Sequence, residues 1–270
     1  METFSSGGFK IAYDDINPQG RAGTFMLVHG FVTNRTENWK RLGWYTAFER
    51  KDYRVIALDH RGHGDSDKPH DPEAYNRLDM ARDVINLMDH VGLEWANVMG
   101  YSMGAHLSLS LARDHAERLG YLILGGIGGT MLPGYKRPDT GRPPPNMTMA
   151  EAMLVDDPEK ISDATQKGFR QFAINQGEDL KALAACTQGK GVGVTPEEMA
   201  LIKAPTLVVA GSHDHLAGDP AALAAAIPGA KSFTIPNTDH FSAIPHVAYR
   251  SAVFDFLEGW MDEDLPEGLR

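Results

Sequence analysis

The sequence contains few features of a secreted or membrane-bound protein. Its 270 residues include one cysteine, Cys186, so no disulfide can form within the chain, as in proteins of reducing compartments. No run of residues approaches the roughly 18 apolar positions of a membrane span. The N-terminus also lacks the basic and apolar segments of a signal peptide. We therefore expect a cytoplasmic protein without a membrane span.

Positive charge is also in short supply. Lysine and arginine number 26 against 36 aspartates and glutamates, which gives a net charge of −10 and an isoelectric point near 5.5. Nucleic acids and anionic membranes repel such a surface, so neither is an expected partner. The hydrophobic content of 42% is sufficient for the core of one large α/β domain. No feature of the sequence indicates an oligomeric state.

Short apolar runs alternate with helical patterns along most of the chain. The predicted strands are an edge strand at 9–14, and then 24–28, 54–58, a run ending at Met99, 121–124, 206–210 and 232–235. The predicted helices between and after them are 39–50, 73–91, a helix after Ser102, and 247–260. Buried runs that alternate with helices predict an α/β fold with a doubly wound, mostly parallel sheet.

The alternation stops between residues 128 and 195. This stretch predicts helices at 149–155, from Pro158 with Asp157 as its cap, and at 178–186. We interpret residues 128–195 as a helical cap inserted into a core made of residues 1–127 and 196–270. A few ordinary connecting helices are the alternative, although compact folds seldom contain so long a detour.

A Gly-x-Ser-x-Gly pattern, Gly100 to Gly104, follows one predicted strand and begins the next helix. Such a strand–turn–helix holds the central residue, Ser102, in a strained conformation, and the small residues on both sides let the strand and helix pass closely. Glycine and serine are common in turns, so the pattern alone is weak evidence. The pattern indicates a catalytic serine only if a base and an acid occur elsewhere in the sequence.

A base and an acid for this serine follow two later strands. Asp214 comes after the strand at 206–210, and His240 comes after the strand at 232–235. The carboxyl ends of parallel strands share one edge of a sheet, so Ser102, Asp214 and His240 can converge there. A serine hydroxyl becomes a nucleophile when a histidine takes its proton and a carboxylate orients that histidine.

With these residues the chain resembles the α/β-hydrolase fold family, in particular its small serine hydrolases with a helical cap. The order Ser102, Asp214, His240 is the family's order, and His29-Gly30-Phe31 is similar to its oxyanion-hole loop. The resemblance covers nearly the whole chain. It implies that Ser102 is the nucleophile, His240 the base and Asp214 the orienting acid. It also implies that the backbone N–H groups of Phe31 and Met103 bind the oxyanion.

Several residues have alternative interpretations. Asp219 is a second candidate acid, although it precedes Pro220 as helix-start residues do. The triplet His213-Asp214-His215 could bind a metal, but no third partner is apparent, and we expect no metal site. We expect His106 to be a packed histidine, and we expect His29 to fix the oxyanion loop by hydrogen bonding. A structural turn beside the site is expected for the segment 59–63, which contains His60 and His63.

Six apolar side chains are candidates for an acyl pocket beneath the cap. We select five of them as pocket residues: Met131, Met149, Met153, Phe169 and Phe172. Met147 is a sixth candidate that could line the same pocket. Packing within the cap is an equal alternative, because methionine fills irregular spaces in either setting.

The reaction expected from the resemblance is hydrolysis of a small-molecule carboxylic ester of small to medium acyl chain, through an acyl-enzyme and without a cofactor. The alternative of the same fold is a carbon–carbon bond hydrolase or lyase acting on a small polar acid. A basic residue beneath the cap would favour it, and the candidates are Arg137, Arg142 and Arg170. A non-catalytic, hydrolase-like binding protein is the third hypothesis, although no triad residue is missing.

Overall fold

The protein is built around one mixed sheet. The computed structural model describes residues 1–136, 144–191 and 193–261, and within them eight strands lie in the order β1-β2-β4-β3-β5-β6-β7-β8. The strands are β1 (Glu2–Ser6), β2 (Phe9–Ile16), β3 (Thr24–Val28), β4 (Arg54–Leu58), β5 (Ala96–Tyr101), β6 (Leu119–Gly125), β7 (Thr206–Gly211) and β8 (Lys231–Ile235). β2 is antiparallel to both of its neighbours, and all the other pairs are parallel. The doubly wound, mostly parallel sheet predicted from the sequence is thereby confirmed.

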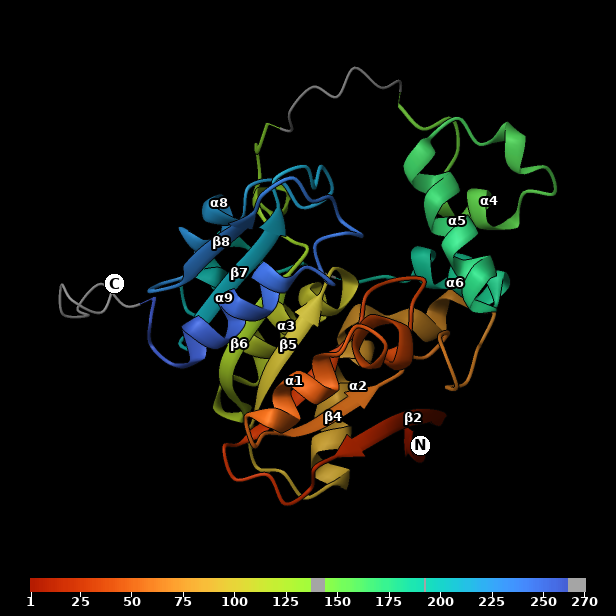
Figure 1. Ribbon diagram of the computed structural model, residues 1–270. Helices are drawn as coiled ribbons and strands as arrows, with labels where there is room; N and C mark the ends of the chain where they lie inside the picture. Colours follow the sequence, from red (N-terminus) through yellow and green to blue (C-terminus); the bar gives the residue numbers. More distant parts are fainter. Residues whose placement is uncertain (137–143, 192, 262–270) are drawn as a thin grey trace.

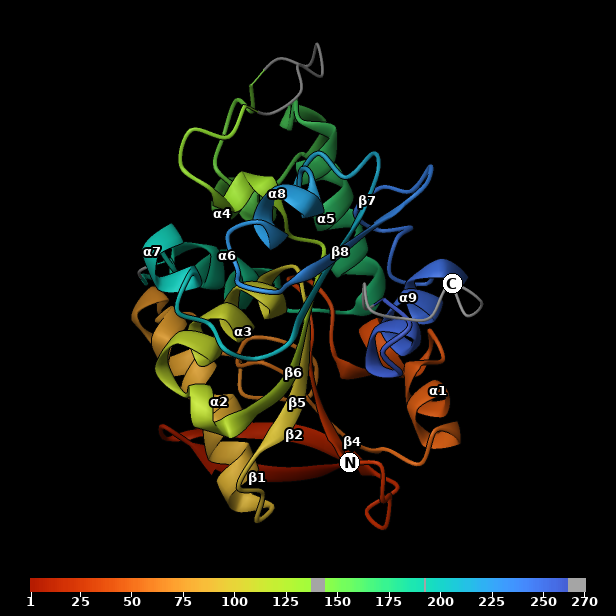
Figure 2. The ribbon, with the colours of Figure 1, turned by 90° about the vertical axis from the view of Figure 1, so that its left-hand side faces the viewer.

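Helices cover both faces of this sheet (Figure 2). α1 (Trp44–Arg50) and α9 (Val247–Leu257) pack on one face, and α2 (Arg77–His90), α3 (Met103–Asp114) and α8 (Pro220–Ala224) pack on the other. The alternation of side chains along β3 divides the core accordingly, because Leu27 packs with the α1 side and Met26 with the α2 side. Both faces of the central parallel strands β3, β4, β5 and β7 are therefore buried, which explains their largely apolar sequences.

The first strand was not predicted. We predicted 9–14 as an edge strand, but β1 pairs with β2 along its outer side and forms the edge itself. The turn between them contains Gly7 and Gly8, both with positive φ angles, which glycine adopts without steric cost. The short strand Glu2–Ser6 has exposed residues on one side, so its apolar signal is weak.

Two predicted helices are broken in the structure. The segment 39–50 forms a π-helical turn, η1 (Thr36–Lys40), and then α1, with Gly43 between them at φ 78°. The segment 73–91 forms the 3₁₀ turn η2 (Pro72–Tyr75) and then α2. Asn76 separates these because its extended backbone ends the first turn and its side chain accepts from the N–H of Leu78.

Between β6 and β7 the chain leaves the sheet and forms α4 (Met149–Leu154), α5 (Ala164–Gln176), α6 (Leu180–Gln188) and α7 (Pro196–Met199). α4, α5 and α6 lie together beside the strands (Figure 1). They enclose a small apolar cluster of their own, which Val32 joins from the loop after β3. This contact places α5 over the carboxyl ends of the strands.

The long helix predicted from Pro158 is wrong. Asp157 caps only a 3₁₀ turn, Pro158–Lys160, and α5 begins six residues later at Ala164, where the Asp163 side chain accepts from the N–H of Gln166. Ile161 is buried between the two turns with extended backbone, and this prevents a continuous helix. Among the helices of the described ranges, none has the length and apolar character needed to cross a membrane.

Candidate active site

Ser102 occupies a sharp turn between β5 and α3. Its backbone angles, φ 52° and ψ −115°, are in a region that non-glycine residues rarely adopt, at a cost of about 1–3 kcal/mol. The flanking glycines make this turn possible. A Cβ atom on Gly104 would lie 1.9 Å from the Val28 carbonyl oxygen, and one on Gly100 would lie 2.5 Å from the Gly104 oxygen. The first turn of α3 therefore rests directly on the backbone of β3.

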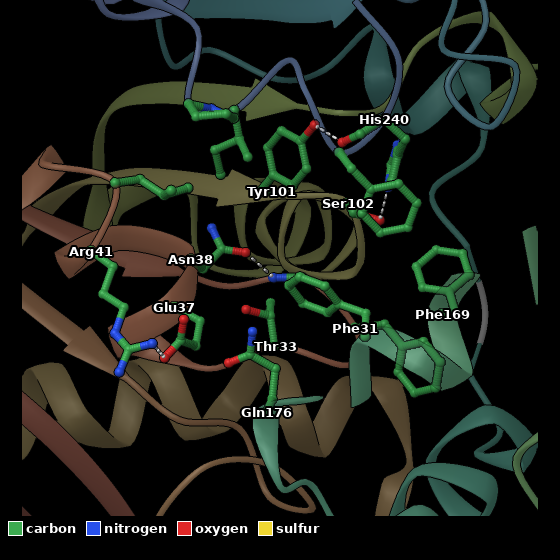
Figure 3. A pocket seen from close by; sticks show the side chains of 16 residues that line it. Phe31, Thr33, Glu37, Asn38, Arg41, Tyr101, Ser102, Phe169, Gln176 and His240 are labelled. Carbon is green, nitrogen blue, oxygen red and sulfur yellow. Dashed lines mark hydrogen bonds and ion pairs between the residues drawn. The ribbon is translucent and has the colours of Figure 1, made fainter. Parts of the chain in front are cut away.

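The three predicted triad side chains meet at this edge of the sheet. His240 Nε2 lies 2.9 Å from Ser102 Oγ (Figure 3). His240 Nδ1 lies 2.8 Å from Asp214 Oδ2. The other oxygen of Asp214 accepts from the N–H groups of Leu216 and Ala217. An ionised carboxylate can only accept, so Nδ1 carries the imidazole proton and Nε2 is free to accept the serine proton. The arrangement can transfer a proton from Ser102 to His240.

A tyrosine that the sequence analysis did not single out fixes the histidine loop. The Tyr101 hydroxyl donates to the main-chain oxygen of His240 at 2.5 Å, and the two rings lie 5.5 Å apart. Burial raises the pKa of Tyr101 well above its usual value, so the phenol stays protonated as a donor. Tyr101 directly precedes the serine in the Gly-x-Ser-x-Gly pattern, and this position was its only signal.

The loop after β3 is held by two buried histidines. His29 Nε2 accepts from the N–H of His60 at 2.9 Å, so Nδ1 is protonated and donates to the Gly30 oxygen at 2.7 Å. His63 Nε2 accepts from the N–H of Val32 at 3.3 Å, and Val32 has a positive φ of 58°. His29 and the segment 59–63 thus make the structural contacts expected of them from the sequence.

This loop approaches Ser102 closely. The N–H of Gly30 donates to Asn38 Oδ1 at 3.2 Å, and a Cβ atom on Gly30 would lie 3.4 Å from the Cβ of Ser102. The N–H groups of Phe31 and Met103 donate to no acceptor within the described residues. Two backbone donors next to Ser102 are thus left for a ligand, as an oxyanion hole requires.

The buried histidines are neutral at physiological pH. Burial, together with the neighbouring histidine rings, lowers the pKa of His29 well below its usual value. Burial also lowers the pKa of His60 to about 3 and that of His63 to about 4. Charge in this region is instead carried by two buried ion pairs, Arg35 with Asp59 and Arg61 with Asp83.

The two candidate acids, Asp214 and Asp219, have different contacts in the structure. Asp219 caps α8 by accepting from the N–H of Ala221 at 2.9 Å, whereas Asp214 contacts His240. No cluster of three or more potential metal ligands occurs among the residues that the structure describes. His106 differs from expectation. Its side chain is exposed and lines a cavity beside Ser102 instead of packing against the core.

Two cavities adjoin Ser102. The first, of about 320 Å³, is bordered by Phe31, Phe169, Phe172 and Phe241, with Glu37 and Arg41 at the far end from Ser102 (Figure 3). The second, of about 420 Å³, is lined by residues of α2 and α3 and by Met131 and Met149. Ser102, Phe31 and Phe169 border both.

The six candidate pocket residues therefore divide. Phe169 and Phe172 line the first cavity, Met131 and Met149 line the second, and Phe169 contributes to both. Met147 lines neither and instead borders a separate cavity that does not include Ser102. Met153 lines neither, because it is fully buried in the apolar cluster of α4, α5 and α6. For Met153 the packing alternative is the correct one.

Of the three basic candidates, the described one, Arg170, does not line either cavity at Ser102. Arg170 donates to the main-chain oxygens of Ala152 and Met153, so it joins α5 to α4. Arg137 and Arg142 lie outside the described residues. The basic side chain that does line the second cavity is Arg77, which the sequence analysis missed because it begins a helix 25 positions before Ser102.

Comparisons with known proteins agree with this architecture. The family model described as alpha/beta hydrolase fold matches residues 23–139. The chain is 28% identical over 257 residues to 2-hydroxymuconate semialdehyde hydrolase of Pseudomonas sp. strain CF600, covering 90% of this chain and 89% of that protein. The enol-lactonase of Burkholderia xenovorans LB400 superposes with a TM-score of 0.70 at 26% identity, covering 95% of this chain and 100% of the other.

A shorter match shows the same local similarity. An 85-residue stretch is 39% identical to a hydrolase of Caulobacter segnis, and it spans 32% of this chain but only 29% of that protein. The family model, the sheet and the structural neighbours together show that the chain has the α/β-hydrolase fold.

Proposed function

We propose that this α/β hydrolase cleaves carboxylic esters through an acyl-enzyme formed on Ser102. The observation that supports this most strongly is the hydrogen-bonded line from Ser102 through His240 to Asp214, with distances of 2.9 and 2.8 Å. A serine, a correctly protonated histidine and a buried carboxylate in this geometry are the components of serine acyl transfer. Lactones are cyclic esters and fall within the same proposal.

The proposed reaction begins when Ser102 Oγ attacks the ester carbonyl and its proton passes to His240 Nε2. Asp214 stabilises the imidazolium, and the N–H groups of Phe31 and Met103 stabilise the oxyanion. Each such donor contributes about 3 kcal/mol in comparable sites. His240 then protonates the departing alkoxide, and the acyl group stays on Ser102. Water then loses a proton to His240 and attacks the acyl carbonyl. The bond to Ser102 Oγ breaks, His240 returns the proton to Oγ, and the acid is released.

We propose that residues 128–195 act as a cap over this site and that the substrate is a small molecule. Cavities of about 320 and 420 Å³ fit ligands of modest size. Phe169 and Phe172 of α5 make the first cavity suited to an acyl chain. A cytoplasmic location is part of the proposal, because the one cysteine, Cys186, is free and buried.

The test is turnover of p-nitrophenyl esters from acetate to laurate by the wild type and by Ser102→Ala. We expect turnover of the shorter esters and its loss in the variant, with circular dichroism confirming that the variant is folded. Labelling of Ser102 by a fluorophosphonate gives an independent measure of nucleophile activation. Absence of both turnover and labelling in folded protein would refute serine catalysis and favour the non-catalytic binding hypothesis.

A second candidate is hydrolysis of a carbon–carbon bond, as in the 2-hydroxymuconate semialdehyde hydrolase that this chain resembles over 90% of its length. The same triad could serve that reaction. The measurement is the decay of 2-hydroxymuconate semialdehyde absorbance in the presence of the enzyme. Fluorophosphonate labelling together with rapid decay and no ester turnover would favour this candidate over the first.

A further inference from the structure

The second cavity beside Ser102 is lined by a positively charged side chain, that of Arg77. Arg77 is the only charged side chain among the described residues that line it. The remaining described lining is apolar or neutral, and it includes Met103, Met131, Met149 and His106. Desolvation by the surrounding protein atoms and the positive charge of Arg77 both oppose protonation of His106, so its pKa is lowered and the ring is neutral at physiological pH. The cavity as described therefore carries a net charge of one positive unit.

The Arg77 guanidinium has no carboxylate partner within the described residues. Its Nη1 atom lies 3.6 Å from Met80 Sδ, 3.4 Å from Met103 Sδ and 3.7 Å from Cys186 Sγ. Its Nη2 atom donates to the main-chain oxygen of Cys186 at 3.1 Å. Sulfur atoms are weak acceptors, so most of the donor capacity of this cation is unused. A half-buried arginine usually has an acidic partner, as Arg35 and Arg61 do here.

The position of Arg77 is fixed by the segment that leaves α6. The N–H of Arg77 donates to the Lys190 oxygen at 2.8 Å, next to the contact between its side chain and Cys186. A Cβ atom on Gly191 would lie 2.4 Å from the Cβ of Arg77, so only glycine lets the chain cross the stem of this side chain so closely. The guanidinium is therefore held at the cavity instead of extending into solvent.

His106 provides a second polar group at the same cavity. Its N–H donates to the Ser102 oxygen at 3.0 Å, so its ring lies one helical turn beyond the nucleophile. None of the described residues forms a hydrogen bond with either ring nitrogen. A neutral imidazole can donate one hydrogen bond and accept another without competing with an anion for Arg77.

From these contacts we propose that Arg77 is a substrate-binding residue that takes a carboxylate group of the substrate into the second cavity. The inference rests on the proposed function of Ser102, since it concerns the substrate of that reaction. A single guanidinium balances a single carboxylate, and its planar N–H groups match the carboxylate oxygens. The apolar part of the substrate then occupies the first cavity, whose described charged residues, Glu37 and Arg41, neutralise each other.

The test uses two matched pairs of esters. In the first pair the acyl group differs, as mono-p-nitrophenyl glutarate against p-nitrophenyl valerate. In the second pair the leaving group differs, as 4-carboxyphenyl butyrate against 4-carbamoylphenyl butyrate. For at least one pair, Arg77→Met should lower the ratio of kcat/KM for the charged ester to that for the neutral ester by about tenfold to a hundredfold, mainly through KM. Ratios that change less than twofold in both pairs would overturn the proposal.

A matched control separates binding from general electrostatics. Arg82→Met removes the same charge from the same helix, but Arg82 is exposed and lines neither cavity at Ser102. The ratios of this variant should equal those of the wild type. An equal fall in both variants would mean that Arg77 acts through long-range charge alone, and this would also overturn the proposal. Thermal unfolding establishes that both variants are folded.

A binding measurement distinguishes failure of this inference from failure of the proposed function. The four esters are titrated calorimetrically into Ser102→Ala protein, with and without Arg77→Met. If the wild type turns over no ester but Arg77→Met weakens binding of a carboxylate ester at least tenfold, the subsite stands and ester hydrolysis fails. If the wild type turns over neutral esters and Arg77→Met leaves binding of all four unchanged, the subsite fails alone.

Discussion

His60 gives the sharpest test of the electrostatics of the buried loop behind the site. Both of its ring nitrogens are buried without a hydrogen-bond partner among the described residues. Burial lowers its pKa from 6.5 to about 3 in the folded protein. As the pH falls below 6.5, the unfolded chain binds a proton that the folded protein excludes. The contribution to stability is therefore complete above pH 6.5 and is lost progressively as the pH falls toward 3.

The stability lost between high pH and pH 5 depends only on the pKa of His60 in the unfolded chain, because its pKa in the folded protein lies well below 5. The interval of 1.5 pH units corresponds to about 2 kcal/mol of lost stability. His60→Leu removes the titrating ring, and it breaks no side-chain hydrogen bond, because the ring makes none. The variant should equal or exceed the wild type in stability at pH 8 and should lose about 2 kcal/mol less between pH 8 and pH 5.

Urea unfolding at pH 8 and pH 5 measures this difference. His63→Leu is the comparison variant, because burial also lowers the pKa of His63, to about 4, but its ring accepts from the N–H of Val32. It should show the same smaller loss in acid, together with a loss of about 1–3 kcal/mol at pH 8 from the unpaired N–H. An acid-induced loss in His60→Leu that equals that of the wild type would refute the reasoning.

Three further predictions concern the elbow and the triad. Asp214→Asn should lower kcat for p-nitrophenyl acetate by about 10⁴-fold, because the amide stabilises the wrong tautomer of His240, and a wild-type rate would contradict the assigned role. Tyr101→Phe leaves the His240 carbonyl without its donor and should lower the free energy of unfolding in urea by about 1–3 kcal/mol, whereas unchanged stability would contradict this contact. Gly104→Ala should lower the thermal unfolding temperature, because the new methyl group overlaps the Val28 oxygen. Helix propensity alone predicts a higher unfolding temperature for this variant, and that result would show that α3 does not rest on β3.

The parts of the fold that could be predicted are those encoded by neighbouring residues, such as apolar runs and helix caps. The strands β3, β4 and β7 are buried along almost their whole length and appear as continuous apolar runs, so their positions follow from the sequence. Ser102, Asp214 and His240 follow β5, β7 and β8, and a parallel sheet brings the ends of these strands together. Asp157 and Asp163 show the limit of this reasoning. Both cap a turn, but only burial of Ile161 between them decides which turn becomes the long helix.

The residues that the sequence did not reveal depend on distant contacts. Tyr101 acts on a main-chain oxygen 139 positions away, and no spacing pattern encodes such a pair. Arg77 begins an amphipathic helix, where an arginine is ordinarily a solvent-exposed residue. Its role depends on contacts with Cys186 and Gly191, which are more than 100 positions away in the sequence. Such residues are identified only when the tertiary structure is known.

The chemistry and the choice of substrate therefore have different structural origins in this protein. Ser102, His240 and Asp214 lie on loops at the ends of core strands, and the glycines of the elbow leave their backbone little freedom. The cavities owe their character to side chains from outside these loops, such as Phe169 on α5 and Arg77 beneath the end of α6. Substitutions on α5 and α6 can change the shape and charge of the cavities without moving Ser102. Proteins similar to this chain over most of its length are accordingly named for substrates as different as a semialdehyde and an enol-lactone.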